Sequence, residues 1–154
     1  MMKLCCEVLS RLQGRTLATA ESCTGGGIGA ALTAVPGSSA TYVGGIISYT
    51  NNVKQTLLSV DSVLLDQEGA VSAPVAEAMA EGARAALNAD VAVSVTGLAG
   101  PGGDDFGNRV GTVFIGYSDY KRTVSVMHLF SGERNEVRSQ TVCAALELIL
   151  QMNQ

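Results

Sequence analysis

Histidine is nearly absent from this sequence, which contains one, His128, in 154 residues. A Ser-His-Asp triad needs a histidine beside the nucleophile. His128 instead falls in a strand-like segment where Val124, Val126 and Phe130 share its face, which is the pattern of a structural residue. We therefore expect no such triad, and a hydrolytic serine would need another base.

Long apolar runs are also missing, since none reaches the eighteen or so residues that cross a bilayer. The first residues, 1–6, lack the long apolar stretch and the small-residue cleavage site of a signal peptide. The four cysteines show neither C-x-x-C spacing nor the density of a secreted disulfide scaffold (Cys5, Cys6, Cys23 and Cys143). We expect a soluble, cytoplasmic protein whose reduced thiols are either buried or without a chemical role.

Excess positive charge is absent, because the formal net charge is −4 and the ten Lys and Arg residues are scattered. This gives no electrostatic footprint for a nucleic acid backbone. Three prolines, eighteen glycines and 47% hydrophobic residues indicate tight turns rather than disorder. The length suits one compact domain, residues 1–154, with no metal or disulfide needed for its core.

Hydrophobic periodicity predicts alternating helices and strands in the first half of the chain and a hairpin in the second half. Helices are expected at 3–13, 28–35, 53–60, from an N-cap at Ser72 to about Asn88, and from Gly132 onward. Strands are expected at 16–20, 42–49, 91–96, 111–117 and 123–130. The pattern predicts a three-layer α/β/α domain with a mixed parallel and antiparallel sheet.

A glycine-rich segment, TLATAESCTGGG (16–27), follows the first predicted strand. Residues 25–30 formally match G-x-G-x-x-A, but the acid expected about twenty residues later in a dinucleotide site is absent between positions 41 and 55. No Gly-Lys-Ser/Thr follows the glycines, so a P-loop is disfavoured even more than a dinucleotide site. Free N–H groups at such a helix start can still bind an anion or an oxyanion.

Ser22 lies between a predicted strand end and that helix start, so its hydroxyl is a candidate nucleophile. The segment SYTNNVK supplies Tyr49 and Lys54, and a desolvated lysine can take a serine proton directly or hold the tyrosine to relay it. An exposed lysine and a half-buried tyrosine are the ordinary alternative. Cys23 is a rival nucleophile, for which we prefer a packing role.

Three other features have a possible role in binding. The loop TGLAGPGG (96–103) follows a strand end, as the first glycine loop does, so both could line one pocket; a surface turn is equally compatible with it. Asp104 and Asp105 have no nearby third ligand, and we expect no metal there. Arg134 and Arg138 lie one helical turn apart and would either meet a phosphate or form a solvated face.

Five ordered motifs closely resemble the CinA C-terminal domain family, over a region that runs from about Leu12 to the last helix. They are AESCTGG (20–26), SYTNNVK (48–54), GAVS (69–72), VTGLAGPGG (95–103) and VGTV (110–113). One departure is the segment from Asp104 to Arg109, where many relatives carry Lys-Pro before Val-Gly-Thr.

The resemblance implies hydrolysis of the carboxamide of nicotinamide mononucleotide to nicotinate mononucleotide and ammonia, in pyridine nucleotide salvage and without a metal or other cofactor. The family's catalytic serine, tyrosine and lysine fall on Ser22, Tyr49 and Lys54. The resemblance also implies that Thr96 and the following glycines approach the nucleotide. The expected binding residues are Thr24, Gly25, Gly26, Thr96, Gly97 and Gly100, the first three through oxyanion contacts.

Two alternatives remain beside an amidohydrolase. One is a nucleotide-binding or competence- and damage-associated module that keeps the pocket without turnover. The other is an oxidoreductase in which the glycine run is part of a dinucleotide site and binds NAD(H). For partners we expect a small nucleotide substrate, no nucleic acid and no membrane, and a homodimer that covers two apolar helix faces.

Overall fold

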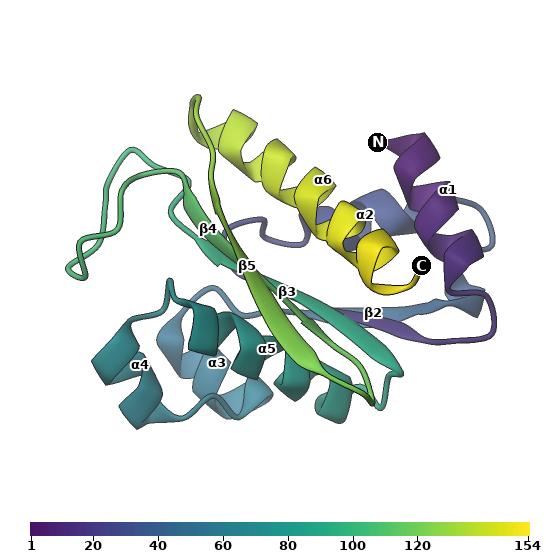
Figure 1. Ribbon diagram of the computed structural model, residues 1–154, viewed down its shortest axis with the longest axis horizontal. Coiled ribbons are helices and arrows are strands. Elements are labelled where there is room, and N and C mark those ends of the chain that lie inside the picture. The colour runs from purple at the N-terminus through teal and green to yellow at the C-terminus, as the bar shows by residue number, and fades with distance from the viewer.

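A computed structural model describes all of residues 1–154 as one α/β unit (Figure 1). Its elements, in chain order, are helix α1 (Met2–Arg11), strand β1 (Leu17–Glu21), helix α2 (Gly27–Thr33), the 3-10 helix η1 (Ser38–Ala40), strand β2 (Tyr42–Ile47), helices α3 (Asn51–Leu58), α4 (Ser62–Glu68) and α5 (Ala73–Ala86), strands β3 (Val91–Gly97), β4 (Thr112–Ser118) and β5 (Thr123–Leu129), and helix α6 (Arg134–Met152).

The five strands form one mixed sheet in the order β2-β1-β3-β4-β5. Strand β1 is parallel to both β2 and β3, whereas β3, β4 and β5 pair antiparallel. Helices α1, α2 and α6 cover one face of the sheet, and α3, α4 and α5 cover the other (Figure 1). The predicted three-layer α/β/α architecture, its mixed sheet and the β4–β5 hairpin are confirmed.

Two apolar cores separate the three layers. The larger core joins the sheet to α1, α2 and α6 and includes Val93, Ile115 and Leu146, each with no exposed surface. The smaller core lies under α5 and includes Val75 and Met79, which are also fully buried. The central strand β3 is buried along almost its whole length, as a strand covered by helices on both faces should be.

Helix α4 and the 3-10 helix η1 were not predicted from the sequence, and several boundaries differ by one or two residues. Helix α4 has only seven residues, and it is begun by Asp61, whose carboxylate accepts the N–H of Val63 at 2.8 Å. Strand β2 ends at Ile47 rather than residue 49. The backbone does start α5 after Ser72, but the Ser72 hydroxyl donates to the carbonyl of Gly69 instead of capping the helix.

The strand order brings the ends of β1, β2 and β3 together at one edge of the sheet. The pairing places Glu21 opposite Val95 of β3 and opposite Ile47 of β2. The chain segments that leave these strands, around Ser22, Ser48 and Leu98, are therefore neighbours. None of the helices combines the length and the apolar character that a crossing of a lipid bilayer requires.

Candidate active site

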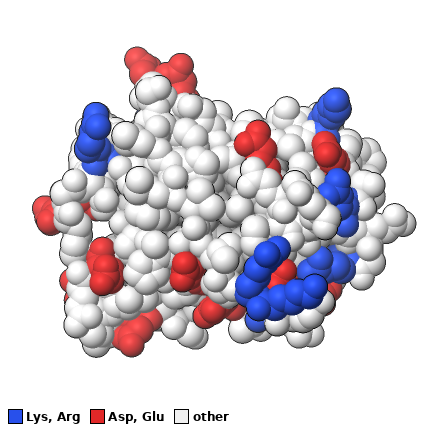
Figure 2. Space-filling view, in the orientation of Figure 1, with Lys and Arg blue, Asp and Glu red and all other residues white.

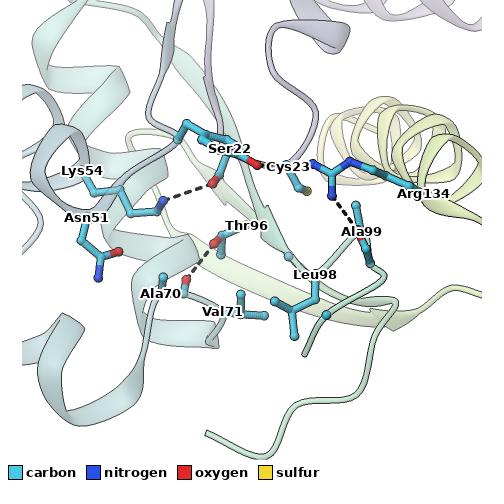
Figure 3. Close-up of a pocket in the computed structure, with 14 residues that line it drawn as sticks. Ser22, Cys23, Asn51, Lys54, Ala70, Val71, Thr96, Leu98, Ala99 and Arg134 are labelled. Atoms are coloured by element: carbon cyan, nitrogen blue, oxygen red, sulfur yellow. Dashed lines mark hydrogen bonds between the residues drawn. The ribbon is translucent and has the colours of Figure 1, made fainter. Parts of the chain in front are cut away.

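A cavity of about 420 Å³ opens at this edge of the sheet, within the size range of small-molecule sites. It is lined by residues from the ends of β1 and β3, from α3, from the turn before α5 and from the start of α6 (Figure 3). The lining residues are Ser22, Cys23, Tyr49, Asn51, Lys54, Ala70, Val71, Thr96, Gly97, Leu98, Ala99, Gly100, Gly102 and Arg134.

Ser22 is the first residue after β1, and its side chain points into the cavity (Figure 3). Its N–H continues the sheet by donating to the carbonyl of Val95 at 3.1 Å. The residue is 7% exposed, so the hydroxyl is held in one place and is still open to a ligand in the cavity. The sheet therefore fixes the backbone that carries this hydroxyl.

Lys54 is buried, which differs from the ordinary case of an exposed lysine. It lies in the first turn of α3, a helix capped by Thr50, whose hydroxyl oxygen accepts the N–H of Val53. Its Nζ donates to Ser22 Oγ at 3.1 Å and to the carbonyl of Ser48 at 2.8 Å. The predicted serine and lysine thus meet in one cavity (Figure 3).

The surroundings of Lys54 shift its protonation equilibrium toward the neutral form. An ammonium group has three N–H donors, but only two acceptors lie within hydrogen-bond distance of this Nζ. Desolvation by burial lowers the pKa of Lys54 from 10.5 to about 8, while the coulombic influence of Cys23 acts weakly in the opposite direction. A measurable fraction of this amine is therefore unprotonated near neutral pH and able to accept the Ser22 proton.

Tyr49 lines the cavity but is not part of this pair. Its side chain is 61% exposed, and its hydroxyl oxygen accepts a hydrogen bond from Arg134 Nη2 at 3.3 Å. No hydrogen bond joins Tyr49 to Ser22 or Lys54. The structure therefore brings two of the three predicted catalytic side chains into contact and leaves the tyrosine on the wall of the cavity.

Thr24, Gly25 and Gly26 do not line the cavity. Positive φ angles of 58° at Gly25 and 97° at Gly26 turn the chain away from it, a conformation that glycine adopts without strain. Their N–H groups are mostly occupied: that of Gly25 donates to the Ser22 carbonyl and that of Gly26 to Glu21. In the segment 22–29, only the N–H groups of Cys23 and Thr24 have no acceptor.

The Cys23 side chain belongs to the larger apolar core and is 6% exposed. Desolvation by burial raises the pKa of its thiol from 9.0 to about 11, against smaller opposing influences that include Lys54 and Arg138. A thiol with this pKa holds almost no thiolate at neutral pH. The preferred packing role for Cys23 agrees with this environment.

The second glycine loop does reach the cavity through Thr96, Gly97 and Gly100. The Thr96 hydroxyl donates to the carbonyl of Ala70 at 2.7 Å and so fixes the turn before α5 against β3 (Figure 3). The N–H groups of Ala99 and Gly100 have no acceptor within the chain. These two groups are free to meet an anionic part of a ligand.

Arg134 and Arg138 have different surroundings, which the sequence did not distinguish. Arg134 lines the cavity, where its Nη1 donates to the carbonyl of Gly100 at 2.6 Å (Figure 3). Arg138 lies behind the nucleophile loop, and its guanidinium donates to the carbonyls of Cys23 and Thr24, each at 3.1 Å. The phosphate alternative therefore fits Arg134, whereas Arg138 supports the loop.

Charge is distributed unevenly around the cavity. Lys54 and Arg134 line it, and no Asp or Glu does, although acidic residues outnumber basic ones by fourteen to ten in the whole chain. On the face shown in Figure 2, Lys and Arg side chains gather mostly toward the right and lower right, and most Asp and Glu side chains lie toward the left and lower edge. A cavity with this lining favours an anionic ligand.

The remaining candidates lie away from the cavity. His128 is on β5, where its ring stacks on Phe130 with centroids 5.1 Å apart, as expected of a structural residue. The Asp104 carboxylate accepts hydrogen bonds from the backbone of Phe106 and from both the backbone and side chain of Asn108. No group of three or more His, Cys, Asp or Glu side chains is placed to hold a metal ion.

Comparison with known proteins gives a consistent match over the whole chain. The family model of the CinA C-terminal domain matches residues 2–153. The nicotinamide-nucleotide amidohydrolase PncC of Pseudomonas putida is 51% identical over 134 residues, which are 87% of this chain and 84% of that protein. A CinA-like protein of Parasynechococcus marenigrum is 51% identical over 144 residues, but the chain spans only 34% of its length.

Solved structures show the same fold. A CinA superfamily protein from Escherichia coli superposes with a TM-score of 0.96 at 34% identity, with 98% of this chain and 89% of that chain covered. A competence/damage-inducible protein from Agrobacterium tumefaciens gives a TM-score of 0.94 at 38% identity, over 99% and 95% of the two chains.

Proposed function

The chain belongs to the CinA C-terminal domain family, and we propose that it hydrolyses the carboxamide of nicotinamide mononucleotide to nicotinate mononucleotide and ammonia. In this proposal Ser22 is the nucleophile and Lys54 is the general base. The reaction would serve pyridine nucleotide salvage in the cytoplasm.

The contact between Lys54 and Ser22 is the single observation on which the proposal depends most. A buried amine with a pKa of about 8 lies 3.1 Å from a hydroxyl at the edge of a 420 Å³ cavity. That separation is within the range for proton transfer from a nucleophile to its base. The near-complete match to a nicotinamide-nucleotide amidohydrolase supports an amide as the substrate.

The first half of the reaction forms an acyl-enzyme. The proton of Ser22 Oγ passes to the neutral Lys54 Nζ as Oγ bonds to the carboxamide carbon, whose oxygen becomes an oxyanion. The free N–H of Cys23, the residue that follows the nucleophile and lines the cavity, is the donor to this oxygen. The C–N bond then breaks, and the Lys54 ammonium protonates the leaving amide nitrogen to give ammonia.

The second half of the reaction restores the enzyme. Lys54, neutral again, takes a proton from a water molecule as the water oxygen bonds to the acyl carbon. The bond from carbon to Ser22 Oγ then breaks, and the proton held by Lys54 returns to Oγ. The carbonyl of Ser48, which accepts from Nζ at 2.8 Å, keeps the amine in place through both halves.

The rest of the cavity suits the nucleotide portion of the substrate. Arg134 supplies a permanent positive charge, and the free N–H groups of Ala99 and Gly100 lie on the same wall, so we assign the phosphate to this region. Tyr49, exposed and held by Arg134, offers an aromatic face to the pyridine ring. In this assignment Tyr49 contributes to binding and the proton passes directly between Ser22 and Lys54.

The proposal is tested by incubating the purified protein with nicotinamide mononucleotide. We expect release of ammonia with a matching amount of nicotinate mononucleotide. Proton NMR of the pyridine ring measures the conversion. Nicotinamide riboside, which lacks the phosphate, serves as the comparison substrate and should show a kcat/KM at least tenfold lower, because it cannot use Arg134. Saturable binding of the nucleotide without product would instead indicate a non-catalytic module.

The pH dependence of the reaction should follow the titration of Lys54. Since only the neutral amine can accept the serine proton, kcat/KM should rise about tenfold per pH unit below a pKa of about 8 and level off above it. Initial rates from pH 6 to 9.5 in buffers of constant ionic strength measure this profile. A flat profile over that range would contradict Lys54 as the base.

A further inference from the structure

Glu21, the residue before the proposed nucleophile, has a carboxylate that does not reach the cavity. It is 2% exposed, and its side chain points to the opposite side of the loop, toward the start of α2. A charge at this depth is costly unless hydrogen bonds compensate for it. Hydrogen bonds to the Glu21 carboxylate must therefore compensate for its burial.

Several donors surround this carboxylate. Oε2 accepts the hydroxyl of Thr24 at 2.6 Å and the N–H groups of Gly26 at 3.1 Å and Ile28 at 3.0 Å. Oε1 accepts the N–H of Gly29 at 2.9 Å. The Glu21 side chain thus accepts hydrogen bonds from four residues of the segment that runs from the nucleophile into α2.

Arg138 holds the same loop from the other side. Its guanidinium donates to the carbonyls of Cys23 and Thr24. Glu21 therefore accepts hydrogen bonds from N–H groups of the loop, while Arg138 donates hydrogen bonds to its carbonyl groups. Together these contacts fix the conformation of the loop. After these contacts, the N–H groups of Cys23 and Thr24 are the ones left without an acceptor.

We propose that Glu21 is a positioning residue that reserves the N–H group of Cys23, a residue of the cavity lining, for the oxyanion. This rests on the function proposed above, and it adds a residue whose side chain touches neither the substrate nor the Ser22 hydroxyl. By binding the later N–H groups of the loop, the carboxylate fixes the loop so that the N–H of Cys23 keeps no acceptor within the chain. Preorganised donors of this kind stabilise the transition state without being moved during the reaction.

The test replaces Glu21 by glutamine, which keeps the size of the side chain but exchanges one acceptor oxygen for an NH₂ donor. That donor would face N–H groups, so the loop should shift. We expect kcat for nicotinamide mononucleotide to fall about 100-fold, the loss typical of one oxyanion donor, while KM changes by less than threefold. A loss confined to KM, or no loss in either constant, would overturn the assignment.

Thr24 provides a second pair of variants in case Glu21→Gln does not fold. Thr24→Val preserves the shape but removes the hydroxyl that donates to Glu21, whereas Thr24→Ser keeps the hydroxyl. We expect a smaller fall in kcat, about tenfold, for valine and recovery to near wild-type kcat for serine. Equal kcat in the two variants would contradict a role for this hydrogen bond.

Asp119→Asn is the matched control for the loss of a buried carboxylate. Asp119 is 7% exposed and accepts hydrogen bonds from the Tyr117 hydroxyl and from the N–H groups of Lys121 and Arg122, beyond the opposite end of β4 from the cavity. Its replacement should lower the melting temperature without changing kcat. If kcat falls equally in this control, Glu21 has only a structural role.

A boronic acid separates this inference from the choice of substrate. With pyridine-3-boronic acid, Ser22 Oγ would bond to boron, its proton would pass to Lys54, and boron would become a tetrahedral anion that needs the same donor. Boron NMR should show the adduct in the wild-type protein and at least 30-fold weaker binding in Glu21→Gln. An adduct without turnover of nicotinamide mononucleotide would reject the proposed substrate and keep the inference, whereas equal affinity in both proteins would overturn it. Absence of both adduct and turnover in the wild type would overturn both proposals.

Discussion

Replacement of Ser22 by alanine should lower kcat/KM for nicotinamide mononucleotide by at least about three orders of magnitude. In enzymes of this kind the loss of the nucleophile leaves only the contributions of binding and of the oxyanion donors. The residue is small and 7% exposed, and the backbone N–H that joins it to β3 is kept in the variant. The variant should therefore fold normally, and the loss should appear in kcat.

The measurement is ammonia release under single-turnover conditions, with calorimetry of nicotinate mononucleotide as a check on the cavity. Product affinity should stay within a few fold of the wild-type value, since Arg134 and the glycine loop are unchanged. Cys23→Ala is the matched control: its thiol is adjacent, but its pKa of about 11 and its burial make it unreactive, so kcat should be preserved. Loss of turnover in Cys23→Ala with retention in Ser22→Ala would identify the cysteine as the nucleophile.

The sequence predicted the layers of the fold because the pattern that creates them is local. Segments such as 91–96 and 123–130 carry strand periodicity that their neighbours do not disturb, and both are strands. Helix α4 has seven residues, of which only Leu65 is buried. It exists because Asp61 caps it and because Leu65 packs into the core under α5, and packing of that kind depends on the rest of the fold.

The site was predicted less completely, and for a related reason. Ser22 and Lys54 could be named from their residue types and from family motifs, but the environment that activates the lysine could not. Its burial depends on where the end of β2 and the start of α3 lie relative to β1, a relation between segments more than twenty residues apart. The roles of Glu21 and Arg138 were missed because each acts through backbone groups that carry no signal in the sequence.

Replacement of Lys54 by methionine should abolish activity while leaving the protein at least as stable at pH 7. Methionine has a straight side chain that fits the space, but it cannot accept the serine proton, so kcat/KM should fall by about 10³-fold or more. The fall in the lysine pKa from 10.5 to about 8 corresponds to about 3 kcal/mol that the buried ammonium costs below pH 8. The variant removes that cost but leaves Ser22 Oγ and the Ser48 carbonyl without their donor, which offsets part of the gain.

The pH dependence of the free energy of unfolding tests whether burial lowers the pKa of Lys54. Between pH 8 and 10.5 the unfolded chain binds a proton at this lysine that the folded protein has lost, so the folded protein gains stability as the pH rises. Urea unfolding measures the free energy of unfolding at pH 7 and at pH 10.5. Between these two values the free energy of unfolding of the wild type should rise by about 3 kcal/mol relative to that of Lys54→Met. Lys3→Met, a change at an exposed lysine of α1, is the control: its free energy of unfolding should change with pH as that of the wild type does. A pH-independent difference between the wild type and Lys54→Met would mean that Lys54 keeps an ordinary pKa, and a lysine of that kind could not activate Ser22 at neutral pH.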